Sequence, residues 1–170
     1  GKLAIAGASE FTAGSLFAPA VITLNDATNV FGGTVSIING KNVSVVGATA
    51  VTVGSAAQNG VVSGSISVES AGALNLGVAG NGNLSVVSFK AAGAVVISDG
   101  LTNTDGLTLQ NISNTGTADV VVAAAGPITL GSGIKLASTG TTTITSTGTA
   151  ASIKDSAPGI SIINGLTLNS

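Results

Sequence analysis

The sequence predicts an all-β protein, a right-handed parallel β-helix (β-solenoid) of about 7–8 coils of roughly 22 residues each. Three observations lead to this prediction. Short apolar–polar–apolar triplets recur along the chain, turn-forming dipeptides separate them, and the triplets return at a nearly constant spacing. Periods of about 20–50 residues are typical of architectures in which each repeat stacks on the one before it.

The triplets have apolar ends and a small or polar centre, and such strict alternation indicates a short strand with one buried face. No segment carries a helical pattern for more than a turn, and the 25 glycines and many β-branched residues disfavour helices. The triplets are Leu3-Ala-Ile5, Ile22-Thr-Leu24, Val35-Ser-Ile37, Val43-Ser-Val45, Val51-Thr-Val53, Ile66-Ser-Val68, Leu74-Asn-Leu76, Leu84-Ser-Val86, Val95-Val-Ile97, Leu107-Thr-Leu109, Val120-Val-Val122, Ile128-Thr-Leu130, Ile134-Lys-Leu136, Ile160-Ser-Ile162 and Leu166-Thr-Leu168.

Turn-forming dipeptides lie between the triplets and accept the positive φ that tight turns need. They are Asn39-Gly40, Asn59-Gly60, Asn81-Gly82, Asp99-Gly100, Asp105-Gly106 and Asn164-Gly165. Such turns suit hairpins as well as coils, so the spacing of the triplets has to decide between the two.

The spacing favours coils, because two interleaved columns of triplets recur at a mean step of roughly 22 residues. The triplets of the first column begin at positions 43, 66, 84, 107 and 128. Those of the second begin at positions 51, 74, 95, 120 and 143. A third column is less regular, with candidates at Val35, Val61 and Ile134.

Residues 21–170 are expected to form one continuous β-helix, whereas residues 1–20 fit the repeat less well and predict an irregular first coil or a cap. This first segment contains Phe11, Phe17 and Pro19 but only one good triplet. The open ends of a solenoid expose strand edges that need covering. Since Leu166 to Ser170 shows no distinct polar cap, we expect the chain to be part of a longer array.

The composition excludes most catalytic chemistry. The chain has no His, Cys, Met, Trp, Tyr or Arg, so it cannot build a catalytic triad, an ordinary zinc site or an arginine clamp for phosphate. Glycoside hydrolysis can use two carboxylates alone, but such sites usually also gather basic and aromatic residues that this chain lacks. We therefore predict that the protein is not an enzyme.

The charge pattern argues against nucleic-acid and membrane partners. Five scattered lysines, with no aromatic side chains interleaved, do not form a phosphate-binding stripe. The mean hydropathy of +0.63 is high, but Gly, Ser, Thr or Asn interrupts every apolar run. The longest run, Val120 to Ala125, is far shorter than the ~20 residues of a spanning helix, and membrane insertion is not expected.

The densest cluster of oxygen ligands is formed by Asp99, Asn103 and Asp105, which makes it a candidate calcium site. Its spacing matches neither an EF-hand loop nor a glycine-rich calcium repeat, and the alternative is a pair of Asp-Gly turns at a corner of the coil. No other metal or cofactor is expected, and no binding residue is predicted.

Threonines suggest a further alternative, an ice-binding β-solenoid. Residues Thr141 to Thr149 contain overlapping Thr-x-Thr units, which in flat ladders form ice-binding surfaces. Elsewhere only Thr102-Asn-Thr104 and Thr115-Gly-Thr117 occur, and neither keeps the regular step from coil to coil that a ladder requires.

The stretch from about Val21 to Ser170 resembles the β-helical shaft of filamentous-haemagglutinin-like exoproteins, large bacterial adhesins exported by two-partner secretion, and autotransporter passengers are similar. A degenerate Gly-x-apolar-polar-apolar repeat carries this resemblance. It is seen in Gly33-Thr-Val-Ser-Ile-Ile-Asn-Gly40, Gly72-Ala-Leu-Asn-Leu76, Gly82-Asn-Leu-Ser-Val86, Gly126-Pro-Ile-Thr-Leu130 and Gly165-Leu-Thr-Leu168. The amino-terminal secretion domain of that family, with its Asn-Pro-Asn-like signatures, has no counterpart here.

The resemblance implies an extracellular or bacterial cell-surface protein with a role in adhesion or biofilm. The expected function is thus a structural and adhesive rod. Its expected partners are copies of itself, the surface of a host or neighbouring cell, or a polysaccharide. The alternatives are an extracellular fibre subunit that self-assembles coil to coil, and the ice-binding solenoid.

Overall fold

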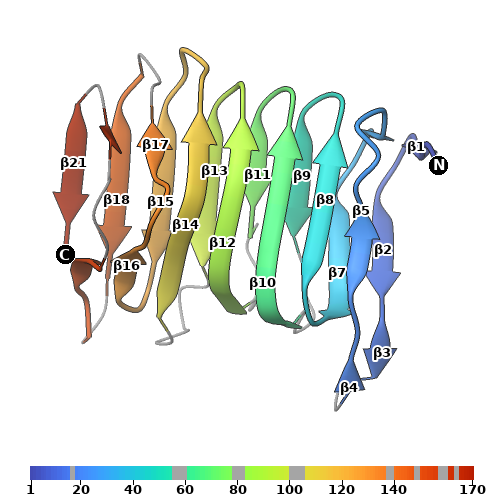
Figure 1. The fold of residues 1–170 in the computed structure, drawn as a ribbon, viewed down its shortest axis with the longest axis horizontal. Helices are drawn as coiled ribbons and strands as arrows, with labels where there is room; N and C mark the ends of the chain where they lie inside the picture. The colour runs from blue at the N-terminus through green and yellow to red at the C-terminus, as the bar shows by residue number, and fades with distance from the viewer. Residues whose placement is uncertain are drawn as a thin grey trace.

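In the computed structural model the chain winds as a parallel β-solenoid with about five regular turns of about 23 residues (Figure 1). The structure describes residues 1–15, 18–54, 61–77, 83–99, 106–136, 140–147, 150–156, 161–162 and 165–170. Every strand pairing among these residues is parallel, except that of one short hairpin. The predicted class, an all-β parallel solenoid, is confirmed.

The strands stack in three columns, here named A, B and C, and column C is the most regular. It consists of β9 (Val51–Gly54), β11 (Leu74–Leu76), β13 (Val95–Asp99), β15 (Val120–Ala124), β18 (Thr142–Ser146) and β21 (Leu166–Asn169). The first residues of these six strands lie in register with one another, at positions 51, 74, 95, 120, 142 and 166.

Column C confirms the predicted positions 51, 74, 95 and 120 and corrects the fifth. The predicted start at Thr143 is wrong by a single position, because Val120 pairs with Thr142. Thr142 and Ile144 point inward and are buried, so Thr143 faces outward. A shift of one position moves every side chain of a strand to the opposite face, so it decides which threonines lie on the surface.

Columns A and B share three long strands that bend from one column into the other: β10 (Val61–Ser70), β12 (Asn83–Ala91) and β14 (Leu107–Asn114). Column A continues them with the end of β7 (Val35–Gly40), with β16 (Ile128–Leu130) and with β19 (Ile153–Asp155). Column B continues them with β5 (Ile22–Leu24), β8 (Val43–Gly47), β17 (Lys135–Leu136) and β20 (Ser161–Ile162).

The other predicted column, with triplets beginning at positions 43, 66, 84, 107 and 128, combined residues that the structure divides between columns A and B. Ile66 pairs with Val43 as expected, but its partner in the next turn is Val87, whereas Leu84 pairs with Val62. The register shifts between Val62 and Ser65, where the strand passes from one column to the other. Because one strand contributes to both columns, the spacing of triplets alone misassigned Leu84.

The expected 7–8 coils are therefore corrected to about five. Dividing the chain length by the repeat length treats every residue as part of a regular coil. The N-terminal segment instead contains short elements: β1 (Ala4–Ile5), β2 (Ser9–Thr12), β3 (Gly14–Ser15), β4 (Ala18–Pro19) and β6 (Val30–Phe31). Strands β1 and β2 pair in parallel with β6 and β7, while β3 and β4 form a local antiparallel hairpin.

The interior is a narrow stack of aliphatic side chains. Each buried strand of column C turns its first and third residues inward, and the same positions of neighbouring turns lie in register. The largest fully buried side chains are Ile, Leu and Val; among them are Ile66, Leu74, Ile97, Leu107, Leu109, Ile112, Ile128 and Ile144. Backbone hydrogen bonds link consecutive turns, for example the 2.9 Å bond from Val51 N–H to the Ala73 carbonyl oxygen.

The corner between columns B and C is closed by small residues and buried polar side chains. The Ser70 hydroxyl lies 3.0 Å from the carbonyl oxygens of Thr49 and Ala73 and accepts a hydrogen bond from Gly72 N–H at 3.2 Å. Asn114 holds the same register position two turns later. Buried polar groups cost free energy unless they are hydrogen-bonded, so these side chains fix the path of each turn against the one before it.

Candidate functional site

The candidate calcium ligands fall mostly outside the described residues. Asp99 ends β13 and is only 1% exposed, and it lies in register with Ala124 of the next turn. Asn103 and Asp105 lie in the stretch that the structure does not describe. Within the described parts of the chain, no group of three or more acidic side chains converges as a metal site would require. The calcium site therefore remains a prediction.

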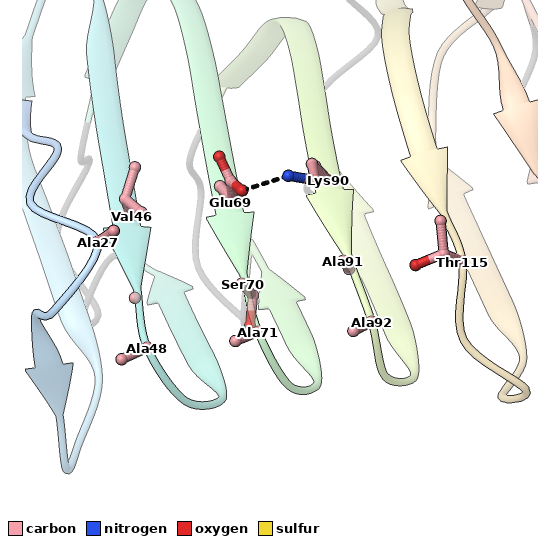
Figure 2. Close-up of a pocket in the computed structure, with 11 residues that line it drawn as sticks. Ala27, Val46, Ala48, Glu69, Ser70, Ala71, Lys90, Ala91, Ala92 and Thr115 are labelled. Atoms are coloured by element: carbon pink, nitrogen blue, oxygen red, sulfur yellow. Dashed lines mark hydrogen bonds and ion pairs between the residues drawn. The ribbon is translucent and has the colours of Figure 1, made fainter.

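A shallow groove of ≈ 270 Å³ crosses the surface at the corner between columns B and C (Figure 2). Alanines from successive turns form much of its lining: Ala48, Ala71 and Ala92, with Thr115 from the turn that follows. Sequence reasoning did not identify this groove. The sequence signal for this groove is the small residue that directly follows each of these strands of column B. Small residues are also required in any tight corner, so the signal does not by itself indicate a groove.

One ion pair lies on the wall of this groove. Lys90 Nζ of β12 and Glu69 Oε1 of β10 are 2.6 Å apart and belong to neighbouring turns, since the two residues lie in register (Figure 2). Both side chains are largely exposed, with 66% and 49% of their surface accessible. A pair in water contributes little to stability, about 0–1 kcal/mol. Its role is to neutralise the two charges over an otherwise uncharged groove.

Asp26 forms a second polar feature, in the turn between β5 and β6. Its Oδ1 accepts hydrogen bonds from the Thr28 hydroxyl at 2.6 Å and from Thr28 N–H at 2.9 Å. These two bonds, the hydroxyl first, favour the ionised carboxylate and lower the pKa of Asp26 from its ordinary value of 3.8. The carboxylate is exposed and organises its own turn, so we assign it a structural role.

The outward side of column C is a regular surface whose residues lie in register from turn to turn, and we call it the uncharged face. Two rows of side chains run along the rod on this side. The first row is Thr52, Asn75, Val96, Val121, Thr143 and Thr167, and the second is Ser98, Ala123, Thr145 and Asn169. None of these side chains is charged, and Val96 and Val121 are 43% and 38% exposed.

The threonines of the uncharged face do not form the ladder that the ice-binding alternative requires. Thr143 and Thr145 both point outward, and Thr167 lies in register with Thr143 in the next turn. In the two preceding turns, however, the first row holds valines, Val96 and Val121. The Thr-x-Thr unit thus occurs in a single turn among the six strands of this face.

No helix among the described residues is long and apolar enough to cross a membrane. Comparison of the chain with protein-family models, with curated proteins and with solved structures finds no match in any of the three.

Proposed function

We propose that this chain is a structural and adhesive rod, part of a bacterial cell-surface or secreted adhesin. The observation that carries the proposal is the continuous backbone ladder, in which parallel strands join each turn to the next through all three columns. Such a ladder resists bending and stretching because a turn can leave only when its hydrogen bonds break together. The resemblance of the glycine-rich triplet repeat to adhesin shafts supports the same role and an extracellular location.

The chemistry of the side chains supports a mechanical role over a catalytic one. The described residues place aliphatic side chains inside and mostly small, uncharged ones outside. The Glu69–Lys90 pair and the alanine-lined groove offer shape and hydrogen bonding to a polysaccharide or protein surface. A rod of this kind acts through its stiffness and its surface, and needs no cofactor.

Single-molecule pulling of the chain between its ends tests the rod. We expect stepwise unfolding with length increments of about 80 Å, the extended length of a turn of about 23 residues. A single smooth extension at low force would contradict a solenoid that resists force.

The adhesive part needs a separate test. Beads coated with the folded chain should be retained on cell layers or polysaccharide-coated surfaces more strongly than beads coated with the heat-unfolded chain. Equal retention of the two bead types would remove adhesion and leave only the structural rod.

A self-assembling fibre subunit is the second candidate, and one observation favours it. Leu166 and Leu168 of β21 hold positions that are buried in the preceding turns of column C, yet they are 45% and 49% exposed. In a fibre, the first coil of another copy would cover them. Electron microscopy of the isolated chain over a concentration series should show filaments one solenoid wide if copies stack in this way, and single short particles at every concentration if they do not.

A further inference from the structure

We propose that the uncharged face is an interface on which a second copy of this chain packs, sheet against sheet. This lateral pairing differs from end-to-end stacking of coils, and it does not depend on whether the rod also adheres to other surfaces. It follows from three properties of the face: its lack of charge, the position of its exposed valines and its size.

The lack of charge distinguishes this face from the outward sides of the other two columns. Column B carries Glu69, Lys90 and Lys135 in a single outward row, and column A presents Lys154 at its last strand.

One carboxylate, that of Asp119, lies at the border of the uncharged face, directly before β15. Its Oδ1 accepts hydrogen bonds from Thr141 N–H and from the Thr141 hydroxyl, at 2.8 and 3.0 Å. The Asp119 carboxylate is thus already engaged within its own chain.

The side chains are also arranged as a self-complementary interface would need them. Val96 and Val121 occupy the third and fourth of the six strands of column C, and the strands on both sides of them present Thr and Asn, while Ser98 and Ala123 lie beside them in the second row. An apolar centre with a polar rim is the usual anatomy of a protein interface. Two-fold packing brings the two valines of one copy onto the two valines of the other whether the rods run parallel or antiparallel.

The small side chains permit close approach, since stacked sheets pack about 10 Å apart when nothing bulky lies between them. Six strands at ~4.8 Å and two rows of outward positions at ~6.6 Å give a face of about 380 Å² per copy. The pair would bury about 760 Å² in total, below the ~1,200 Å² of a standard interface and in the range of weak, transient contacts. That size fits a second copy that binds weakly, with a dissociation constant in the micromolar range or above.

Sedimentation velocity of the full chain from micromolar to millimolar concentration tests the proposal. We expect a reversible monomer–dimer equilibrium, which the double variant Val96→Lys/Val121→Lys weakens at least tenfold because it buries four like charges. The matched control is Val21→Lys, which makes the same change at an exposed valine (59%) outside the face and should leave the equilibrium unchanged.

A milder double variant, Val96→Thr/Val121→Thr, keeps β-branched residues in both strands and guards against misfolding of the lysine variant. It should weaken the dimer severalfold while the circular dichroism and melting temperature stay the same. A chain that remains monomeric throughout would overturn the proposal, as would a dimer that the lysine and threonine variants leave intact. Thermal hysteresis of a monomeric chain that disappears in the lysine variant would assign the face to ice instead, and would also overturn it.

Discussion

The side-chain amide of Asn114 donates a 3.1 Å hydrogen bond to the carbonyl oxygen of Gly93, one turn earlier, while its Oδ1 accepts a 2.8 Å bond from Gly116 N–H. Asn114 is fully buried, and the two bonds tie the corner it belongs to onto the corner below. A single side chain thereby satisfies backbone groups of two turns that the parallel ladder leaves unpaired at the bend.

Replacement of Asn114 by alanine should lower the free energy of unfolding by about 1–3 kcal/mol, because it leaves a buried carbonyl and a buried N–H without their partner. Chemical denaturation monitored by circular dichroism measures the change. Asn75→Ala is the matched control, since it removes the same amide from the outward side of β11, and it should change stability by less than about 0.5 kcal/mol. Equal effects of the two substitutions would contradict the role assigned to Asn114.

Gly93 should not tolerate a side chain. A Cβ at this position would lie 2.6 Å from the backbone nitrogen of Ala73 and 2.8 Å from the carbonyl carbon of Gly72. Gly93→Ala must therefore push two turns apart, and we expect a loss of about 1–3 kcal/mol in thermal or denaturant unfolding.

Gly106→Ala is the control for Gly93→Ala, because a Cβ at Gly106 meets only Pro127 at ordinary contact distances of 3.5 and 3.7 Å. That variant should be neutral, or more stable by about 0.4–1 kcal/mol through a less flexible unfolded chain. Similar destabilisation by both alanines would show that close approach between turns is not what restricts Gly93.

Neighbouring residues of β13 should differ sharply in their contribution to stability. Ile97 is fully buried in the aliphatic stack, whereas Val96 points outward. Ile97→Ala should cost about 2–5 kcal/mol, from lost burial and the cavity left behind, while Val96→Ala should cost less than about 0.5 kcal/mol in the monomer. Urea unfolding at low protein concentration makes the comparison, and a larger effect at Val96 would mean that the register of β13 is shifted by one position.

Asp26 should titrate below 3.8 in the folded chain, since the two hydrogen bonds from Thr28 stabilise its ionised form and lower its pKa. The stability that these bonds provide is then present above the unfolded-state pKa and is lost as the pH falls through the lower folded-state pKa. A carboxyl-carbon NMR titration measures the midpoint. Thr28→Ser keeps the hydroxyl and should keep the low value, whereas Thr28→Ala should move the midpoint upward, and no movement would show that the hydroxyl bond is not its cause.

The sequence predicted the solenoid because inward positions must be apolar in every turn, and this requirement repeats at the length of a turn. Column C followed the prediction from Val51 to Val120, where turn-forming or small residues separate every strand from the next. The prediction failed where one strand serves two columns: β10, β12 and β14 each continue across a shift in register, so Leu84 was assigned to the wrong column. The error at Thr143 arises differently: Thr141, Thr142 and Thr143 are consecutive, so the sequence does not show which of them begins the strand.

The surfaces were harder to predict than the fold. The alanine-lined groove arises from residues about one turn apart in sequence, each of which is ordinary on its own. The uncharged face was missed for a similar reason: the triplets placed Val96 and Val121 at outward centres, but the face forms only when residues of six turns lie in register. Asp99, expected in a calcium site or in an Asp-Gly turn at a corner of the coil, is buried at the end of β13, and its burial could not be predicted from the dipeptide.

The hydrogen bonds between turns join residues about one turn apart in sequence, as Ser146 and Gly126 do, wherever they occur along the rod. The entropy lost in closing a loop depends on its length, and here that length is one turn whether the array has five turns or fifty. Each finished turn offers an open strand edge as a template on which the next can form, so folding can proceed from one end to the other at a constant cost per step. A chain built in this way can grow longer by duplication of its repeats without becoming slower to fold per residue.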